Sequence, residues 1–330
     1  MRVLSITSLF PDSTRKYFAP FNLKQIVAIS RLVELRLIVP VPWTRALKLK
    51  LTRKRLIAPD ECRDLFPIHY PVYFYLPGFL RSSYGMSYYL SIRSLFRSIV
   101  DEFKPEIVYS TWAYPDSYSA YLAARDVNLP LIIRVHGSDI NEYMQDGARR
   151  EKILEAIRYS SGVVVVSAAL KRLLVEYGIE EEKLHLIYNG VDRDSFKPSD
   201  KFEAREKLGI NSDKRVILFA GNLKWVKGVD LLVEAFAGLR DLNEVELHIV
   251  GDGPLRKRLV SMVSKLGLRG SVIFHGPIEH RMMPVWISAC DILCLPSRAE
   301  GTPNIVLEAL AGARPVVAVS YTHLTLPTKA

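Results

Sequence analysis

The chain has 330 residues, 49% hydrophobic and 24% charged, which is an ordinary globular composition with room for two domains. Its three cysteines, Cys62, Cys290 and Cys294, are too few and too unevenly spaced for a disulfide framework or a metal site, so a reducing cytoplasm fits best. The formal net charge is +10, and Lys and Arg outnumber Asp and Glu by 17 to 8 in residues 1–110. No apolar run approaches the about 20 residues that a membrane-spanning helix needs, which favours a protein that is soluble or lies on a surface.

Short apolar runs bounded by turns alternate with amphipathic stretches along most of the chain, the pattern of parallel strands connected by helices. Ser167 is predicted to cap a helix that Gly178 ends. The expected strands of the first half are residues 3–7, 35–39, 107–110, 131–135, 163–166 and 184–187. After a polar segment at 192–200 the strands resume at residues 216–220, 245–250, 272–274, 292–295 and 315–319.

This restart predicts two successive doubly wound α/β sheets rather than one large sheet. We expect one Rossmann-like domain at residues 1–198 and a second at 199–319, with a ligand cleft at the carboxyl ends of both sheets. The chemistry should then lie in the loops that follow the strands.

A dense basic segment lies at residues 45–55, RALKLKLTRKR, and the aromatic run YPVYFY follows at 70–75. Basic and aromatic residues together can bind anionic lipid head groups. A solvated basic loop is an equal alternative. Nucleic acid is not expected as a partner, because no nucleic-acid-binding motif accompanies the charge.

The most specific stretch is residues 296–312, PSRAEGTPNIVLEALAG. The strand at 292–295 ends just before it, Pro303 suits a first helical position, and Gly312 suits the residue after a helix. Glu300 then lies in the loop before the helix and Glu308 on the helix itself. Because free amides at a helix start attract anions, we expect a phosphate there with a carboxylate on either side.

This E-x₇-E pattern resembles the donor-site motif of the retaining GT-B glycosyltransferases of family 4, and the resemblance extends over residues 1–319. It implies that Glu300 faces the transferred sugar in a catalytic role and that Glu308 holds ribose hydroxyls of a nucleotide-sugar donor. Thr302, Pro303 and Asn304, at the helix start, are expected to bind the donor as well.

Residues 221–228, GNLKWVKG, resemble the G-x-L-x-x-x-K-G element of the same family. Gly221 gives the backbone room to approach phosphate, and Lys227 supplies a compact positive charge for the diphosphate. The family commonly has Arg where Asn222 stands, so one positive charge is missing here unless Lys224 replaces it.

Gly251 and Gly253, in GDGP, resemble the family's turn near the nucleotide base. Alone this is a weak signal, and the lack of a third glycine argues against the dinucleotide fingerprint of a dehydrogenase.

In the first half, residues 134–139, RVHGSD, resemble the H-G-x-D loop of the family. This implies that His136 lies near the donor sugar and the forming bond, and that Asp139 lies close to the acceptor. Trp112 and Tyr114, in a loop that follows a strand, are further candidates for the acceptor side. The loop at residues 10–21 is rich in aromatic residues and proline where many relatives have a Gly-Gly pair, so close backbone contact with the donor is not expected there.

Residues 187–198 resemble the N-G-V-D-x-x-x-F-x-P segment that closes the first domain, with a structural role. They contain a D-x-D sequence, Asp192-Arg193-Asp194, which holds a divalent ion in GT-A enzymes. Because it lies in a joint rather than after a strand of the catalytic domain, we expect no metal site and no cofactor.

The resemblance implies transfer of a sugar from a nucleoside-diphosphate sugar to a hydroxyl of a glycan or lipid-linked acceptor, with retained configuration, in the synthesis of cell-envelope polysaccharide or glycolipid. The cytoplasm is the expected compartment, with attachment to the inner face of the plasma membrane as an option. One alternative is an inactive GT-B relative that binds a membrane surface. Another is a GT-B epimerase or a phosphorylase-like enzyme.

The end of the sequence, residues 320–330, does not continue the family pattern. We expect a tail there without packed secondary structure, and a second domain that lacks the segments with which relatives continue. A short natural tail is the alternative.

Overall fold

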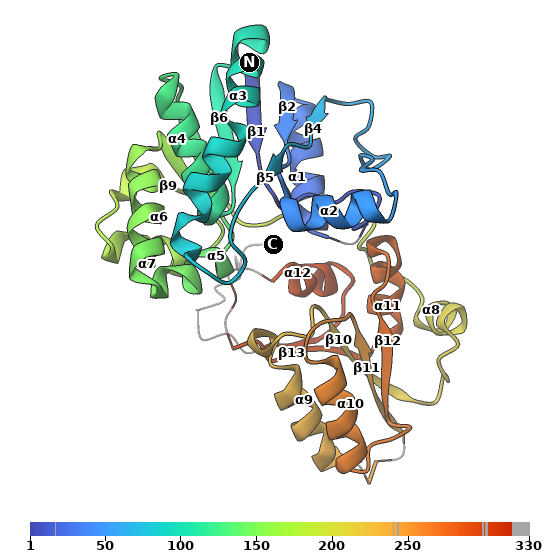
Figure 1. The fold of residues 1–330 in the computed structure, drawn as a ribbon. Helices are drawn as coiled ribbons and strands as arrows, with labels where there is room; N and C mark the ends of the chain where they lie inside the picture. Colours follow the sequence, from blue (N-terminus) through green and yellow to red (C-terminus); the bar gives the residue numbers. More distant parts are fainter. Residues whose placement is uncertain (17, 240, 243, 299, 301–302, 319–330) are drawn as a thin grey trace. The chain divides into compact units, whose positions relative to one another are not determined.

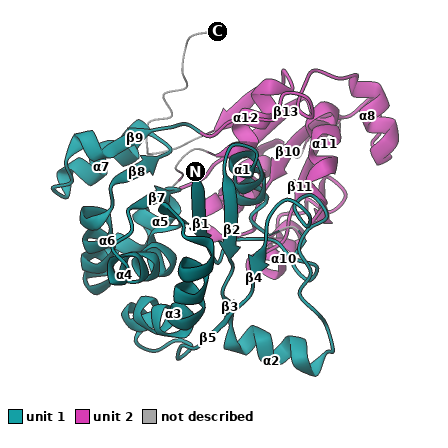
Figure 2. Ribbon diagram, turned by 90° about the horizontal axis from the view of Figure 1, so that it is seen from above, with its two compact units in different colours: residues 1–188 teal, residues 189–330 magenta. Residues whose placement is uncertain are grey.

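The computed structural model describes residues 1–16, 18–239, 241–242, 244–298, 300 and 303–318. Thr302 and the tail at 320–330 lie outside the described residues. Contacts divide the chain into two compact units, Met1–Tyr188 and Asn189–Ala330, which Figure 2 colours separately. The segment 189–198, which the sequence placed at the end of the first domain, belongs to the second unit.

In the described part of the first unit, a seven-stranded parallel sheet has the order β4-β2-β1-β6-β7-β8-β9 (Figure 1). The sheet reverses its winding at β1, because β2 pairs with one edge of β1 and β6 with the other. The strands are β1 (Arg2–Ile6), β2 (Glu34–Ile38), β4 (Ile68–His69), β6 (Ile107–Thr111), β7 (Leu131–Val135), β8 (Gly162–Val165) and β9 (Leu184–Leu186). A separate pair is formed by β3 (Val41–Pro42) and β5 (Val72–Tyr73).

Both faces of this sheet are buried. Leu4 and Ile6 of β1 belong to the larger core, whereas Val3 belongs to a smaller core on the opposite face. Helices pack on these faces, as a parallel sheet requires. They are α1 (Pro20–Ser30), α3 (Tyr84–Phe103), α4 (Tyr118–Asp126), α5 (Ser138–Asn141), α6 (Gly147–Tyr159) and α7 (Ala168–Glu176), with the short helical turns η1 (Arg81–Ser83), η2 (Ala113–Ser117), η3 (Tyr143–Gln145) and η4 (Glu181–Lys183). A further helix, α2 (Trp43–Leu51), lies against β3 and β5 and buries none of its residues.

In the described part of the second unit, a five-stranded parallel sheet has the order β12-β11-β10-β13-β14. Its winding reverses at β10, which lies between β11 and β13. The strands are β10 (Arg215–Ala220), β11 (Val245–Val250), β12 (Val272–Gly276), β13 (Ile292–Leu295) and β14 (Val316–Ala318). The helices are α8 (Lys201–Leu208), α9 (Val229–Phe236), α10 (Arg256–Lys265), α11 (Met283–Ala289) and α12 (Asn304–Ala311), with the turns η5 (Trp225–Lys227), η6 (Ala237–Leu239) and η7 (His280–Met282).

The prediction of two doubly wound α/β units is therefore confirmed. The helix predicted from Ser167 is α7, where the Ser167 hydroxyl accepts a hydrogen bond from the Leu170 amide at 3.2 Å. Gly178 follows it with a positive φ of 76°. Pro303 precedes α12 instead of beginning it.

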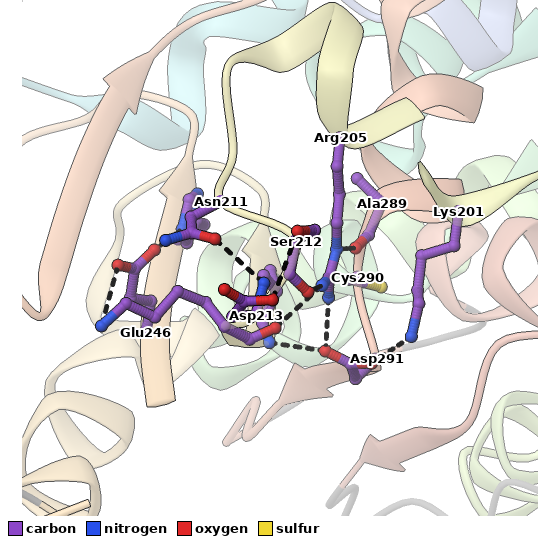
Figure 3. Close-up of polar contacts among 12 residues, drawn as sticks. Lys201, Arg205, Asn211, Ser212, Asp213, Glu246, Ala289, Cys290 and Asp291 are labelled. Carbon is purple, nitrogen blue, oxygen red and sulfur yellow. Dashed lines mark hydrogen bonds and ion pairs between the residues drawn. The ribbon is translucent and has the colours of Figure 1, made fainter. Parts of the chain in front are cut away.

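A buried arginine fixes α8 to the sheet of the second unit (Figure 3). The guanidinium of Arg205 is 2% exposed and donates to the backbone oxygens of Ala289, Ser212 and Lys214. It also donates to the Asp291 carboxylate at 2.6 Å. Asp291 stands just before β13, so this network lies at the amino ends of the strands and has a structural role.

Candidate active site

Three loops of the second unit meet at the carboxyl edge of its sheet, because β11, β10 and β13 are neighbours and run in parallel. Residues 221–228 follow β10, residues 251–254 follow β11, and residues 296–303 connect β13 to α12. The reversal of winding between β10 and β13 is the place where open α/β sheets bind ligands. Each predicted donor-binding residue that the structure describes lies in these loops or in α12.

The two residues expected to carry opposite charges in the donor site form an ion pair. The ammonium of Lys227, at the end of η5, contacts the Oε1 atom of Glu300. The hydroxyl of Ser297 donates to the same oxygen at 2.7 Å, and Ser297 itself is 1% exposed. The Glu300 side chain is 12% exposed and that of Lys227 is 27% exposed. The fold thus brings Lys227 and Glu300 together, which the sequence did not predict, and adds Ser297 to them.

The second glutamate of the motif is held by a histidine that the sequence did not single out. Nε2 of His280, in η7, lies 2.9 Å from Oε1 of Glu308, and the ring of Phe196 packs edge-on against His280. One helical turn before Glu308, the Oδ1 atom of Asn304 accepts a hydrogen bond from the Asn189 side chain at 2.8 Å. Glu308 and Asn304 therefore share one face of α12.

Of the three glycines predicted at the donor site, two are required by close packing of the backbone and one is not. A Cβ at Gly251 would come within 1.9 Å of the Gly221 carbonyl oxygen, and one at Gly253 would lie 2.5 Å from the Asn222 side chain. These two glycines are thus required by the contact between the loops after β10 and β11. A Cβ at Gly221 would meet only the Phe219 ring, at 3.7 Å or more, so nothing in its surroundings excludes a side chain.

The remaining candidates of the donor loops lie as follows. Asn222 and Lys224 are exposed, and the Lys224 amide donates to the Asn222 carbonyl at 2.8 Å. Pro303 is buried at the start of α12.

An arginine that sequence reasoning missed connects two of these loops. Arg298 donates to both carboxylate oxygens of Asp230 in α9 and to the carbonyl of Trp225. Its guanidinium also lies 4.5 Å from the centre of the Trp225 ring. This network raises the pKa of Arg298 and lowers that of Asp230, mainly through their mutual hydrogen bonds. The sequence gives no signal for the pair, since the partners are far apart along the chain.

In the first unit, His136 lies at the carboxyl end of β7 among aromatic rings. Its ring centre is 5.1 Å from that of Phe21 and 6.1 Å from that of Trp112. Burial, with the nearby positive charge of Arg134, lowers the pKa of His136 to about 3, so that the imidazole is neutral near pH 7. Among the described residues, its Nε2 atom has no hydrogen-bond partner.

Most of the candidates for the acceptor side make hydrogen bonds that hold the fold of the first unit together. Asp139 is fully buried, and its carboxylate accepts from the amides of His136 and Gly137 on one oxygen and from that of Ala113 on the other, each at 2.9 Å. It therefore ties the loop after β7 to the loop after β6. Burial raises the pKa of Asp139 to about 6.

The Tyr114 ring is 2% exposed, and its hydroxyl donates to the Ser82 carbonyl at 2.6 Å. Trp112 is only partly buried, with a positive φ of 84°. The acceptor-side role of Asp139, Trp112 and Tyr114 stays a prediction.

A further buried carboxylate lies where the winding of the first sheet reverses. Asp116 is fully buried and accepts hydrogen bonds from the amide and hydroxyl of Ser8, which connects the loop after β6 to the loop after β1. Burial raises its pKa to about 7. Sequence reasoning named only the loop that contains it.

The D-x-D sequence in the joint makes hydrogen bonds within its own segment. The carboxylate of Asp192 accepts from the amides of Asp194 and Ser195 and from the Ser195 hydroxyl. Within the described residues, no group of three or more His, Cys, Asp or Glu side chains could hold a metal ion.

The sequence matches two family models. The model described as Glycosyltransferase Family 4 matches residues 45–195, and the model described as Glycosyl transferases group 1 matches residues 200–324. The glycosyltransferase TuaC of Bacillus subtilis, named for teichuronic acid biosynthesis, is 27% identical over 328 residues, which are 96% of this chain and 80% of TuaC.

Two solved structures share the fold. HepE of Anabaena in complex with UDP-glucose has a TM-score of 0.71 at 22% identity, and the alignment covers 96% of this chain and 80% of HepE. Sucrose-phosphate synthase of Thermosynechococcus elongatus has a TM-score of 0.78 at 17% identity, with coverage of 96% and 81%. The two family models, which together span most of the sequence, show that the chain belongs to the group 1, family 4 glycosyltransferases, and the two solved structures show that it has the GT-B fold.

Proposed function

We propose that this glycosyltransferase takes its sugar from a nucleoside-diphosphate sugar and transfers it, with retained anomeric configuration, to a hydroxyl of a glycan or lipid-linked acceptor. The observation that carries the proposal is the pairing of Lys227 with Glu300 between the loops that follow β10 and β13, with Glu308 on the helix that follows the second of these loops. The site offers a cation for a diphosphate and a carboxylate for ribose hydroxyls. The solved complex of HepE with UDP-glucose agrees with such a donor.

The chemistry requires stabilisation of a departing diphosphate and of an oxocarbenium-like sugar. Lys227 supplies fixed positive charge for the first, since electrostatic groups set in advance lower a barrier without reorganisation. Glu300 is placed to orient the sugar or favour its positive charge, and His136 is the further catalytic candidate. No metal is required in this scheme. The teichuronic acid context of TuaC favours an acceptor in cell-envelope polysaccharide or glycolipid synthesis.

Incubation with a panel of nucleotide sugars and envelope acceptors tests this function. We expect transfer with retention that persists in EDTA and is abolished by Glu300→Gln. Manganese-reversible loss in EDTA would contradict the metal-independent scheme. Donor consumption without an acceptor product, or with uptake of free phosphate, would favour an epimerase or phosphorylase. Failure to turn over any donor would favour an inactive membrane-bound relative.

We also propose that the first unit docks on an anionic membrane surface through α2 and the loop at 74–80. Trp43 of α2 donates to the Tyr75 carbonyl at 2.8 Å and stacks on Phe74, so the two segments are side by side. Large apolar side chains on both are exposed, from 49% for Leu47 to 76% for Leu51. The others are Phe74, Leu76, Phe79 and Leu80.

Beside these apolar side chains lies positive charge. Lys48, Lys50 and the basic run 53–55 are exposed, whereas Arg45 is turned inward and bound to Asp12 at 2.7 Å. Exposed apolar groups next to clustered Lys and Arg match the interface of an anionic bilayer. In the described residues, no helix combines the length and apolar character needed to cross a bilayer.

A further inference from the structure

We propose that Glu300 is the counter-ion of Lys227 before a donor binds, and that the diphosphate of an incoming donor takes Lys227 away from it. Glu300 thereby determines donor affinity in addition to any role in transfer. This inference rests on the proposed function, because it assumes that a nucleoside diphosphate binds at the loops after β10 and β13.

Lys227 already has an ionic partner before a donor binds. Its ammonium contacts Oε1 of Glu300, and both side chains are more than two-thirds buried. An ion pair buried to this extent is screened less by water than a surface pair. A diphosphate must therefore replace an existing partner of Lys227, which makes the free energy of donor binding less favourable.

The two loops that carry Lys227 and Glu300 do not have to move for this exchange. Arg298 donates to the Trp225 carbonyl, its amide donates to the Val226 carbonyl at 2.7 Å, and its guanidinium pairs with Asp230. A Cβ at Gly228 would lie 1.8 Å from the Pro296 carbonyl oxygen, so the two loops are in close backbone contact. Transfer of Lys227 to a phosphate thus requires only rotation of its long, flexible side chain.

Glu300 keeps a hydrogen-bond partner after the exchange. The buried hydroxyl of Ser297 donates to Oε1 of Glu300 at 2.7 Å and does not depend on Lys227. Once the ammonium leaves, that oxygen is held in place by Ser297 and can accept a hydrogen bond from the donor sugar. Donor binding therefore prepares the carboxylate that the sugar meets.

The test is a double-mutant cycle on nucleotide binding, measured by titration calorimetry with the tightest binder among UDP, GDP and ADP. Glu300→Gln removes the charge but keeps an oxygen that can accept from Ser297. We expect this variant to bind the nucleotide about threefold to tenfold more tightly, because Lys227 no longer has an ionic partner to leave. Lys227→Met, which keeps the apolar stem, should bind at least about tenfold more weakly.

The double variant distinguishes two explanations: Lys227 changes its partner from Glu300 to the diphosphate, or Glu300 simply repels the diphosphate. If Glu300 acts by holding Lys227, Glu300→Gln gives little or no gain in the Lys227→Met background. An equal gain in both backgrounds means that Glu300 only repels the diphosphate, and overturns the exchange. Glu206→Gln, the same charge change at an exposed position of α8, is the matched control and should leave affinity unchanged.

The outcomes also separate this inference from the proposed function. Weaker binding by Lys227→Met without tighter binding by Glu300→Gln would leave the donor site in place and reject the exchange. If none of the three nucleotides binds to the wild-type chain, both the donor site and the exchange are rejected. Thermal melting of each variant checks that it is folded.

Discussion

Arg298 donates hydrogen bonds to both carboxylate oxygens of Asp230, at 2.8 and 2.9 Å, and so connects the loop that contains Glu300 to the helix that follows Lys227. The side chains are 19% and 14% exposed, which makes the pair less sensitive to screening than a surface ion pair. The position of the donor loops relative to each other therefore depends on a contact outside the family motifs.

Replacement of Arg298 by Lys should loosen this connection, because an ammonium cannot form the two-pronged pair or stack on Trp225 in the same way. We expect Arg298→Lys to destabilise the second unit by about 1–2 kcal/mol and to weaken nucleoside-diphosphate binding. Urea unfolding and calorimetry measure the two effects. Arg281→Lys, at an ion-paired arginine that is 81% exposed, is the control and should change neither. Unaltered nucleotide binding by Arg298→Lys would show that the connection does not position the site.

Glu308 should matter only for ligands that contain a ribose. We expect Glu308→Gln to weaken UDP binding several-fold, because an amide is a poorer acceptor for ribose hydroxyls than a carboxylate, about 1 kcal/mol per bond. Its binding of inorganic pyrophosphate should not change. Lys227→Ala is the complementary variant and should weaken both ligands. Equal losses for UDP and pyrophosphate in Glu308→Gln would place Glu308 at the phosphates instead.

The Arg205 network predicts a large stability difference between two neighbouring substitutions. Asp291→Ala leaves the buried guanidinium of Arg205 without its counter-ion, which should cost about 3–5 kcal/mol. Lys201→Met removes the other cation on Asp291, but its side chain is 29% exposed and the cost should stay within about 1 kcal/mol. Urea unfolding followed by tryptophan fluorescence reports both. Similar losses would mean that Arg205 does not depend on Asp291.

Asp116 predicts a pH dependence of stability with a defined sign. Burial raises its pKa from 3.8 to about 7, so the folded chain keeps a proton that the unfolded chain releases between pH 4 and 7. Stability contributed by this group is present below pH 4 and is lost as the pH rises towards 7. Asp116→Asn should therefore gain stability relative to the wild type across that window, by at most about 1.4 kcal/mol per pH unit.

The sign of this pH dependence can be checked against a carboxylate whose pKa is lowered in the folded chain instead of raised. The Tyr89 hydroxyl lowers the pKa of Asp126, so Asp126→Asn should differ from the wild type mainly above pH 4, with a difference that shrinks at lower pH. A constant difference between Asp116→Asn and wild type from pH 4 to 7 would contradict a protonated Asp116.

Docking on a membrane surface predicts that the charged and the apolar side chains contribute separately to vesicle binding. Vesicles that contain phosphatidylglycerol should bind the wild-type chain in low salt, at up to about 1 kcal/mol per basic residue. Replacement of Lys48, Lys50, Arg53, Lys54 and Arg55 by Gln should release the chain. Replacement of Phe74, Leu76, Phe79 and Leu80 by Ser should leave binding in low salt but abolish it in high salt, since charge alone is screened. Sedimentation with vesicles measures each case, and equal binding by all three chains would return the segment to a solvated loop.

Much of the fold could be predicted from local sequence. The strands at 131–135, 245–250 and 292–295 have the predicted bounds, because each is a short, mainly apolar run between turn residues. The helix at 43–51 was missed: its basic residues look like a loop, and the structure buries none of its residues, so there is no clear apolar stripe to recognise.

The candidate site was predictable as a set of motifs but not as a set of contacts. The sequence indicated Lys227, Glu300 and Glu308, because each lies in a motif that can be recognised within a short stretch of residues. It gave no sign of Ser297, His280 or Asp230, whose side chains meet the motifs only after folding. The pairing of Lys227 with Glu300 exists because β10 and β13 are neighbours in the sheet although far apart in the chain. Strand order is fixed by how the whole core packs, so no local stretch of sequence can specify it.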